Sequence, residues 1–227
     1  MKLNELIEQS ESMSPDVLIK EAYGIFQPHI IATSSFGTNS GVLIDLIAKT
    51  ELPIKIVYIN TGFLFKETLT YIESLKNYYK KLYFIEISPF QPKEEFLKEY
   101  GLDIIKENPD LCCRLRKIEP LANFFKEKKI KAWLTGIRKD QTKYRQKLHK
   151  IELTQTGIYK INPILEWTSK DVYYYMIKNN IPFHPLYEKG YTSIGCEPCT
   201  DLPDLLDERS GRWKGKTKKE CGLHTNL

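Results

Sequence analysis

Four apolar runs of strand length, separated by segments of helical character, most constrain how this chain can fold. The runs are "HIIATS" (29–34), "IKIVYI" (54–59), "LYFIEI" (82–87) and "KAWLTG" (131–136). The segments read as helices are "VLIDLIAK" (42–49), "KETLTYIESLKNYYKK" (66–81) and residues 109–128. Strands that alternate with helices pair in parallel. The sequence therefore predicts a doubly wound α/β fold, with a mostly parallel sheet and helices on both faces.

Further elements flank this alternation. Ser14 and Pro15 are typical of a helix start, and that helix should run to about Phe26. Residues 149–164 resemble a hairpin with a Gly turn, and "WTSKDVYYYMIKNN" reads as a helix capped by Thr168 or Ser169. The last stretch is too polar and too rich in Gly and Lys to pack alone. We therefore expect one domain over residues 1–207 and a mobile C-terminal tail over 208–227.

Composition narrows the class of protein. The 227 residues include 41% apolar side chains, enough for one core, and the net charge of +5 is mild and dispersed. This charge fits a basic pocket for a small anion as well as a nucleic-acid surface, and for most of the lysines a solvated surface is the better interpretation. No apolar run approaches the roughly 18 residues of a membrane span, and the N-terminus lacks the apolar stretch of a secretory signal. We therefore expect a cytoplasmic protein without membrane or nucleic-acid partners, in which structural disulfides are rare.

The loop after the first run is the strongest candidate for a phosphate site. In "SSFGTNSG", Gly37 permits a close approach or a positive φ, Ser35, Thr38 and Ser40 offer hydroxyls, and the following helix start offers backbone N–H groups. The alternative is an ordinary strand–helix turn with a Ser cap. Ligands of such folds bind at the carboxyl ends of the strands, so loops 34–40, 60–65 and 135–145 should surround the site. Neither a Walker A motif nor a dinucleotide fingerprint is present.

Four of the five cysteines form two tight groups. Cys112 and Cys113 are adjacent, and Cys196 and Cys199 have a CxxC spacing. Four thiolates suit zinc or an iron–sulfur cluster. Adjacent cysteines close poorly on a single ion, which favours a cluster, although any one of the four could be a buried filler. The fifth, Cys221, lies in "KKECGLH", where neighbouring cations favour the thiolate; an inert surface cysteine is the alternative.

Basic residues gather near these cysteines and at a strand end. Guanidinium forks match phosphate and sulfate oxygens. Any single member is more often a surface residue than a ligand, but the clustering favours an anion site. The set comprises Arg116, Lys117, Arg138, Lys139, Arg145, Arg209 and Arg212.

Taken together, the segments resemble the motifs of one family. "SSFGTNSGVLIDL", "CCRLRKIEPL", "TGIRKDQT", "NPILEWTSKDV", "GYTSIGCEPCT", "ERSGRW" and "KKECGLH" are similar, in this order, to motifs of the assimilatory sulfonucleotide reductases, over residues 30–224. The resemblance implies an adenine nucleotide alpha hydrolase-like fold. The CC…CxxC pattern is typical of the branch that reduces adenylyl sulfate to sulfite and AMP.

This resemblance implies a role for each motif residue. Cys221 would be the nucleophile that forms an S-sulfocysteine, thioredoxin the electron donor, and one 4Fe–4S cluster per chain would be held by Cys112, Cys113, Cys196 and Cys199. The substrate would be bound by Ser35, Phe36, Gly37, Thr38, Asn39, Ser40, Thr61, Gly62, Lys117, Arg138, Arg145, Arg209, Arg212 and His224. A homo-oligomer is compatible with this reading.

Three alternatives stay open at this point. The substrate could be 3′-phosphoadenylyl sulfate, or both nucleotides could be accepted. An ATP-pyrophosphatase-type enzyme that thiolates a tRNA base would use the same loop, but it should carry an RNA-binding appendage. A non-catalytic zinc or iron–sulfur module would not need the "ECGLH" segment.

Overall fold

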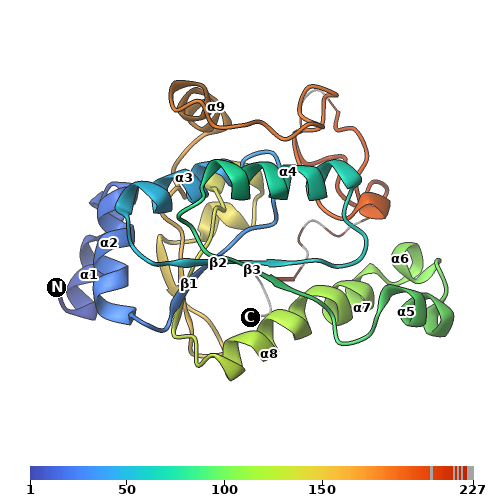
Figure 1. Ribbon diagram of the computed structural model, residues 1–227, viewed down its shortest axis with the longest axis horizontal. Coiled ribbons are helices and arrows are strands. Elements are labelled where there is room, and N and C mark those ends of the chain that lie inside the picture. The colour runs from blue at the N-terminus through green and yellow to red at the C-terminus, as the bar shows by residue number, and fades with distance from the viewer. Residues whose placement is uncertain (205–206, 217, 219, 221, 224–227) are drawn as a thin grey trace.

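One six-stranded sheet forms the centre of the protein (Figure 1). The computed structural model describes residues 1–204, 207–216, 218, 220, 222 and 223. The strand order is β3-β2-β1-β4-β6-β5, and every neighbouring pair is parallel except β5 with β6. The strands are β1 (Ile30–Thr33), β2 (Lys55–Ile59), β3 (Phe84–Ile87), β4 (Ala132–Leu134), β5 (Ile151–Leu153) and β6 (Tyr159–Ile161). The predicted doubly wound α/β fold is confirmed, including the hairpin.

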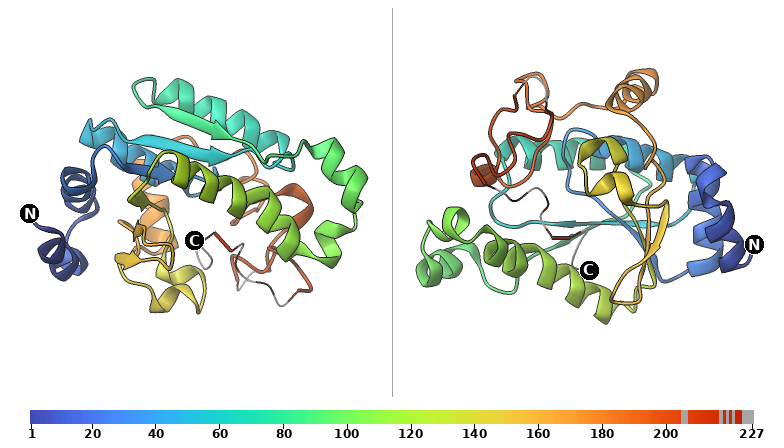
Figure 2. Two further views of the ribbon diagram at one scale, coloured as in Figure 1. Left: turned by 90° about the horizontal axis from the view of Figure 1, so that it is seen from below. Right: turned by 180° about the vertical axis from the view of Figure 1, so that it is seen from behind.

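Helices cover both faces of the sheet (Figures 1 and 2). The α-helices of one side are α1 (Leu3–Gln9), α2 (Pro15–Phe26), α3 (Ser40–Thr50), α4 (Lys66–Tyr78) and α9 (Ser169–Lys178). Those toward the other side are α5 (Lys93–Tyr100), α6 (Ile104–Glu107), α7 (Pro109–Cys113) and α8 (Glu119–Glu127). Short helical turns lie at η1 (Ser10–Ser12), η2 (Arg114–Ile118), η3 (Lys139–Gln141), η4 (Arg145–Lys147) and η5 (Glu197–Cys199). No helix in the described ranges is both long and apolar enough to cross a bilayer.

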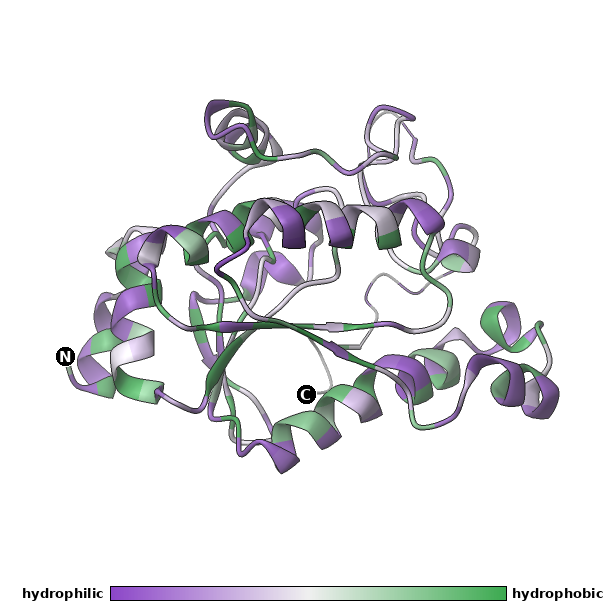
Figure 3. Cartoon of the chain, in the orientation of Figure 1, coloured by the Kyte–Doolittle hydropathy of each residue, from purple (hydrophilic) through white to green (hydrophobic). Residues whose placement is uncertain are grey.

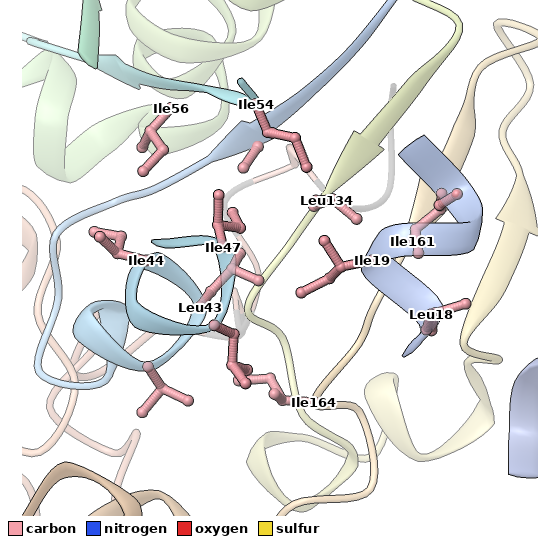
Figure 4. Close-up of a cluster of buried hydrophobic side chains, with 14 of the residues drawn as sticks. Leu18, Ile19, Leu43, Ile44, Ile47, Ile54, Ile56, Leu134, Ile161 and Ile164 are labelled. Carbon is pink, nitrogen blue, oxygen red and sulfur yellow. The ribbon is translucent and has the colours of Figure 1, made fainter. Parts of the chain in front are cut away.

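Successive residues of each central strand enter different cores. Ile30 and Ala32 of β1 belong to the larger cluster under α2, α3 and α4, whose centre is drawn in Figure 4. Ile31, between them, belongs to the smaller cluster with Leu121 and Phe125 of α8. Colouring by hydropathy shows the mixed polar and apolar surfaces of the covering helices (Figure 3). The period of two that defines a strand thus distributes apolar side chains to both layers.

The predicted helix over 109–128 is present but contains a wide turn. Asn108 caps its start by accepting a hydrogen bond from the Leu111 N–H at 3.0 Å, and Pro109 occupies the first turn. After α7, the segment η2 is π-helical, and α8 continues from it. Insertions of this kind often occur at functional sites. Here the turn contains the neighbouring basic residues Arg116 and Lys117.

The beginning of the predicted tail is packed against the domain. Arg212 forms an antiparallel bridge with Thr200, and the Trp213 N–H donates to the Cys199 carbonyl at 3.1 Å. Trp213 is only 5% exposed. Residues 211–213 therefore pack against the domain although the stretch cannot pack alone, because the side chain of Trp213 is buried between segments 195–201 and 109–117.

Candidate active site

A cleft opens beyond the carboxyl ends of the neighbouring strands β1 and β4. The chain proceeds outward from β1 to β2 and β3, and then returns to the other side of β1 with β4, so the strand order reverses at this point. Ligands of open α/β sheets bind at such a reversal. The cleft has a volume of about 200 Å³ and is bordered by parts of all three predicted loops. Its walls also contain Lys117, Arg209, Arg212, Trp213 and Leu223.

The loop after β1 presents small polar groups to this cleft. Ser35, Gly37, Thr38, Asn39 and Ser40 all line it. The Thr38 hydroxyl donates to the Thr192 carbonyl at 2.7 Å and so ties the loop to the 192–195 segment. Asn39 occupies the N-cap position of α3 without making a side-chain cap hydrogen bond. The alternative of an ordinary Ser-capped turn therefore does not describe this helix start.

Two members of the predicted substrate set support the cleft from behind. Phe36, rather than Gly37, has the positive φ, of 48°, and its buried ring packs edge-on against Tyr58 with centroids 5.1 Å apart. Gly62 has a φ of 79°, and a Cβ there would lie 3.1 Å from the Arg116 guanidinium. Neither residue lines the cleft. Gly37 instead permits the close approach, since its Cβ would meet the Ile194 carbonyl at 3.3 Å.

Arg209 and Arg212 bring positive charge to one wall. Arg209 donates from Nη1 to the Ser193 hydroxyl at 3.2 Å. The Arg212 guanidinium lies against Gly195, where an added Cβ would be only 2.2 Å from Nη2. It also stacks over Trp213, with Cζ 4.5 Å from the ring centroid. The lack of a side chain at Gly195 is therefore what allows Arg212 to reach the cleft.

Arg145 lines the cleft in a buried ion pair with Glu220. Its Nε and Nη2 donate to the two carboxylate oxygens at 2.9 and 2.8 Å, and the Thr142 hydroxyl donates to the same carboxylate at 2.9 Å. Burial alone would raise the pKa of Glu220, but Arg145 outweighs it and the pKa is lowered. Glu220 is therefore an ionised group inside the cleft.

Arg138 does not reach the cleft, and its assignment as a substrate ligand is not supported by its position. The side chain is fully buried. Its Nε donates to Asp140 at 3.0 Å and its Nη2 to the Ser169 hydroxyl at 2.7 Å. Ser169 in turn donates to Glu208 at 2.8 Å. Arg138 thus connects the loop after β4 with the start of α9 and with the segment that carries Arg209.

The four paired cysteines surround a second, smaller cavity next to the cleft. Cys112, Cys113, Cys196 and Cys199 line it together with Lys117 and Trp213, and these last two also line the cleft. The four are thiols rather than half-cystines. No three His, Cys, Asp or Glu side chains within the described ranges are arranged to hold one metal ion. The predicted grouping of the four cysteines is present, without the geometry of a single-ion site.

These thiols differ in their electrostatic surroundings. Burial, and then the neighbouring sulfurs, raise the pKa of Cys112 to about 12. Burial also raises the pKa of Cys199. At Cys196, burial acts in the same direction, but Lys117 and a contact with the Thr61 hydroxyl outweigh it, so the pKa is lowered. Buried thiolates are costly without compensating charge, which here comes from Lys117 and Arg212.

The structure adds cleft residues that the sequence reasoning missed. They are Thr135, Gln141, Thr192, Ser193 and Glu220. Three of them lie in segments that were singled out for their cysteines: Thr192 and Ser193 in "GYTSIGCEPCT", and Glu220 in "KKECGLH". The cysteines were the stronger signal in both segments. Cys221 and His224 lie outside the described residues.

Comparison with known proteins identifies similar chains. Residues 29–202 match the family model described as "Phosphoadenosine phosphosulfate reductase domain". "Adenosine 5'-phosphosulfate reductase 2" of Bacillus subtilis is 40% identical over 91% of this chain and 88% of its own. "Phosphoadenosine 5'-phosphosulfate reductase" of Gloeobacter violaceus is 34% identical over 98% and 93%. The crystal structure of phosphoadenylyl-sulfate reductase from Candida auris superposes with a TM-score of 0.75 at 30% identity, covering 88% of this chain and 98% of that one.

Proposed function

Because this chain belongs to the phosphoadenosine phosphosulfate reductase family, we propose that it is an adenylyl-sulfate reductase, which converts adenylyl sulfate to sulfite and AMP. The observation that carries this proposal is the cleft at the strand-order reversal. Hydroxyl groups of the 34–40 loop line it together with the cationic side chains of Lys117, Arg209 and Arg212. A small nucleotide with two adjacent anionic groups is the ligand that such walls fit.

The chemistry begins with the thiolate of Cys221. It attacks the sulfur atom of the phosphosulfate, a bond forms between the two sulfurs, and the bond from that sulfur to the bridging oxygen breaks. AMP leaves with the bridging oxygen on its phosphate, and the enzyme retains an S-sulfocysteine. AMP is a good leaving group, so the protein needs cations around the anionic oxygens more than a general acid. Lys117, Arg209 and Arg212 would supply them.

A dithiol partner, thioredoxin, completes the turnover. One of its thiolates attacks the sulfur of Cys221, sulfite leaves, and a mixed disulfide forms. The second thiol of the partner resolves this disulfide, which returns Cys221 as a thiol and leaves the partner oxidised. The two electrons that reduce the sulfonate therefore come from the dithiol. We propose that residues 208–227 carry the nucleophile to the domain formed by residues 1–207.

We further propose that the four paired cysteines hold one 4Fe–4S cluster. Four thiols beside the cationic Lys117 and Arg212 match the charge of such a cluster. A cubane offers each sulfur its own iron, so adjacent Cys112 and Cys113 need not converge on one ion. When bound, the cluster would contribute its charge to the field at the cleft. Lys117 borders both cavities and would bind the substrate sulfate from that side.

The direct test uses protein purified without oxygen. Incubation with adenylyl sulfate and reduced thioredoxin should release sulfite and AMP in equal amounts. Without thioredoxin, mass spectrometry should find one added SO₃ on the peptide that contains Cys221, and Cys221→Ser should bind nucleotide without forming the adduct. An adduct on another cysteine would overturn the assignment of the nucleophile.

The choice of nucleotide needs its own measurement, because both kinds of reductase occur among the similar proteins. The paired cysteines favour adenylyl sulfate through the family resemblance. Comparing kcat/KM for adenylyl sulfate and for 3′-phosphoadenylyl sulfate decides between them. A clear preference for the second would replace this part of the proposal.

A further inference from the structure

We propose that Glu208 is a positioning residue: it is anchored at both its backbone and its side chain, and so holds the next residue, Arg209, at the wall of the cleft. The inference rests on the proposed function in that it takes Arg209 as a cation that binds the anionic groups of the nucleotide. It also gives a role to Arg138, which the sequence suggested as a substrate ligand but which does not line the cleft.

The backbone of Glu208 is tied to the 192–195 segment. The Thr192 hydroxyl donates to the Glu208 carbonyl at 2.7 Å. The carbonyl of Thr192 in turn accepts a hydrogen bond from the Thr38 hydroxyl, also at 2.7 Å. Through these two bonds, Thr192 joins the 34–40 loop to the segment that carries Arg209. The hydroxyl groups and the cations of the cleft are therefore held relative to one another by one residue.

The carboxylate of Glu208 is tied to the start of α9. The Ser169 hydroxyl donates to Oε2 of Glu208 at 2.8 Å and accepts from Nη2 of Arg138 at 2.7 Å. This Nη2 lies 3.8 Å from the same Oε2. Arg138 is fully buried, and a buried guanidinium needs carboxylates close by, which Asp140 and Glu208 supply. The Glu208 side chain is 49% exposed, so the ion pair alone would contribute little, and the bridging hydroxyl is what fixes its direction.

Arg209 follows this anchored residue directly, and its own groups are held as well. Its N–H donates to the Asp207 carboxylate at 2.8 Å, and its carbonyl accepts from the Arg212 N–H at 2.9 Å. Its Nη1 donates to the Ser193 hydroxyl at 3.2 Å. A long side chain loses rotamer freedom when it binds an anion, so an arginine that is already ordered binds that anion more tightly. Release of Glu208 should therefore weaken binding by disordering Arg209.

The first experiment asks whether Glu208 acts through Arg209. Calorimetry measures the affinity for adenylyl sulfate in a Cys221→Ser background, where no sulfonate can be transferred. Glu208→Ala should bind about tenfold more weakly than this reference. Glu188→Ala, at an exposed position outside the cleft, should bind like the reference.

A double-mutant cycle then separates positioning from a general effect on the fold. In an Arg209→Gln background, Glu208→Ala should change the affinity by less than about twofold, because the group that it positions is already missing. Equal losses in the two backgrounds would overturn the proposal. Ser169→Ala takes the place of Glu208→Ala in the same cycle if the latter fails to fold.

The second experiment requires no nucleotide. The rate at which phenylglyoxal modifies Arg209 is measured by peptide mass spectrometry in Thr192→Val and Ser169→Ala, each of which removes one anchor without changing a charge. Both variants should raise the rate by about threefold or more, since a freed side chain samples more rotamers. Thr70→Val, at an exposed position of α4, should keep the wild-type rate. An unchanged rate in either anchor variant would contradict the proposal.

The two experiments also distinguish this inference from the proposed function. If the protein does not bind adenylyl sulfate at all, the proposed function fails, while the modification rates still test the anchor. If it binds adenylyl sulfate and Glu208→Ala behaves like Glu188→Ala, the function stands and the inference fails.

Discussion

The hydroxyl oxygen of Thr61 lies 3.3 Å from the sulfur atom of Cys196, at the boundary between the cleft and the cysteine cavity. The same hydroxyl accepts a hydrogen bond from the Phe63 N–H at 3.1 Å, and the carbonyl of Thr61 is held by Arg116. One residue of the loop after β2 therefore touches both candidate sites.

Replacing this hydroxyl should weaken retention of the proposed iron–sulfur cluster. In Thr61→Val, the sulfur of Cys196 loses a hydrogen-bonding partner. A hydrogen bond to a charged group contributes about 1.5–3 kcal/mol. We expect the protein to lose iron to a chelator at least threefold faster than wild type, as measured by iron content over time. Thr70→Val, at an exposed position of α4, is the control. Equal iron loss in the two variants would contradict a role for the Thr61 contact.

Shortening the fork of Arg116 should destabilise the fold. Its Nε and Nη2 both donate to the Thr61 carbonyl, at 3.0 and 2.7 Å, and it also donates to the Gln91 carbonyl. Lysine cannot reproduce this planar arrangement. We expect Arg116→Lys to lower the free energy of unfolding by about 2 kcal/mol in urea titrations. Arg114→Lys, at an exposed neighbouring position, should change it by less than about 0.5 kcal/mol.

A methyl group at position 195 should displace Arg212. The new Cβ of Gly195→Ala would lie 2.2 Å from Nη2 and 2.5 Å from Cζ of that arginine. We expect KM for the nucleotide to rise at least tenfold, because one cation leaves the wall of the cleft. Gly24→Ala is the matched control, since a Cβ at that position of α2 meets nothing within 4 Å. That control should keep its KM and gain about 0.5–1 kcal/mol of stability.

Stability should fall with decreasing pH through His184. The side chain is fully buried, and burial lowers its pKa from 6.5 to about 4. Nδ1 faces the Leu186 N–H at 3.1 Å as an acceptor, so Nε2 carries the proton and donates to Thr68. Between these two pKa values the unfolded state binds a proton that the folded state does not. The stability lost from pH 6.5 to 4 is therefore roughly 3 kcal/mol.

Nuclear magnetic resonance of the imidazole nitrogens measures this directly. The His184 signals should keep the neutral Nε2–H pattern down to about pH 5. A titration midpoint near 6.5 would contradict the assignment. Urea titrations at pH 6.5 and 4.5 give the corresponding loss of stability.

The layered fold was predictable because its evidence is local. The apolar runs that form β1 and β2 are bounded by polar loops. These runs are of strand length and too short for typical buried helices, so they predict strands. The helix from Pro15 to Phe26 was marked by its first residues. The strand order was not predictable in this way, since the return of β4 to the far side of β1 depends on packing between distant segments. Segment 91–107 contains α5 and α6. Its apolar residues show no periodicity clear enough to predict these helices.

The candidate site was predictable in its members more than in their roles. Arg138 and Arg145 both follow β4 and look alike in the sequence. Arg138 donates hydrogen bonds to Asp140 and Ser169, away from the cleft. Arg145 lines the cleft and pairs with Glu220. Such differences depend on partners from other elements, which no local pattern contains. The cysteines were easier to assign to one site. Two closely spaced pairs, far apart in the chain, are typical of ligands that come together in the folded protein.

That separation along the chain bears on how the protein matures in the cell. Cys112 and Cys113 lie in the wide-turned helix after the third strand, whereas Cys196 and Cys199 follow the sixth strand and α9. Translation proceeds at about 5–20 residues per second, so the first pair is made several seconds before the second exists. Loading of the proposed cluster must therefore wait for a nearly finished chain. Until then, the thiols of the early pair have no cluster to protect them from oxidation.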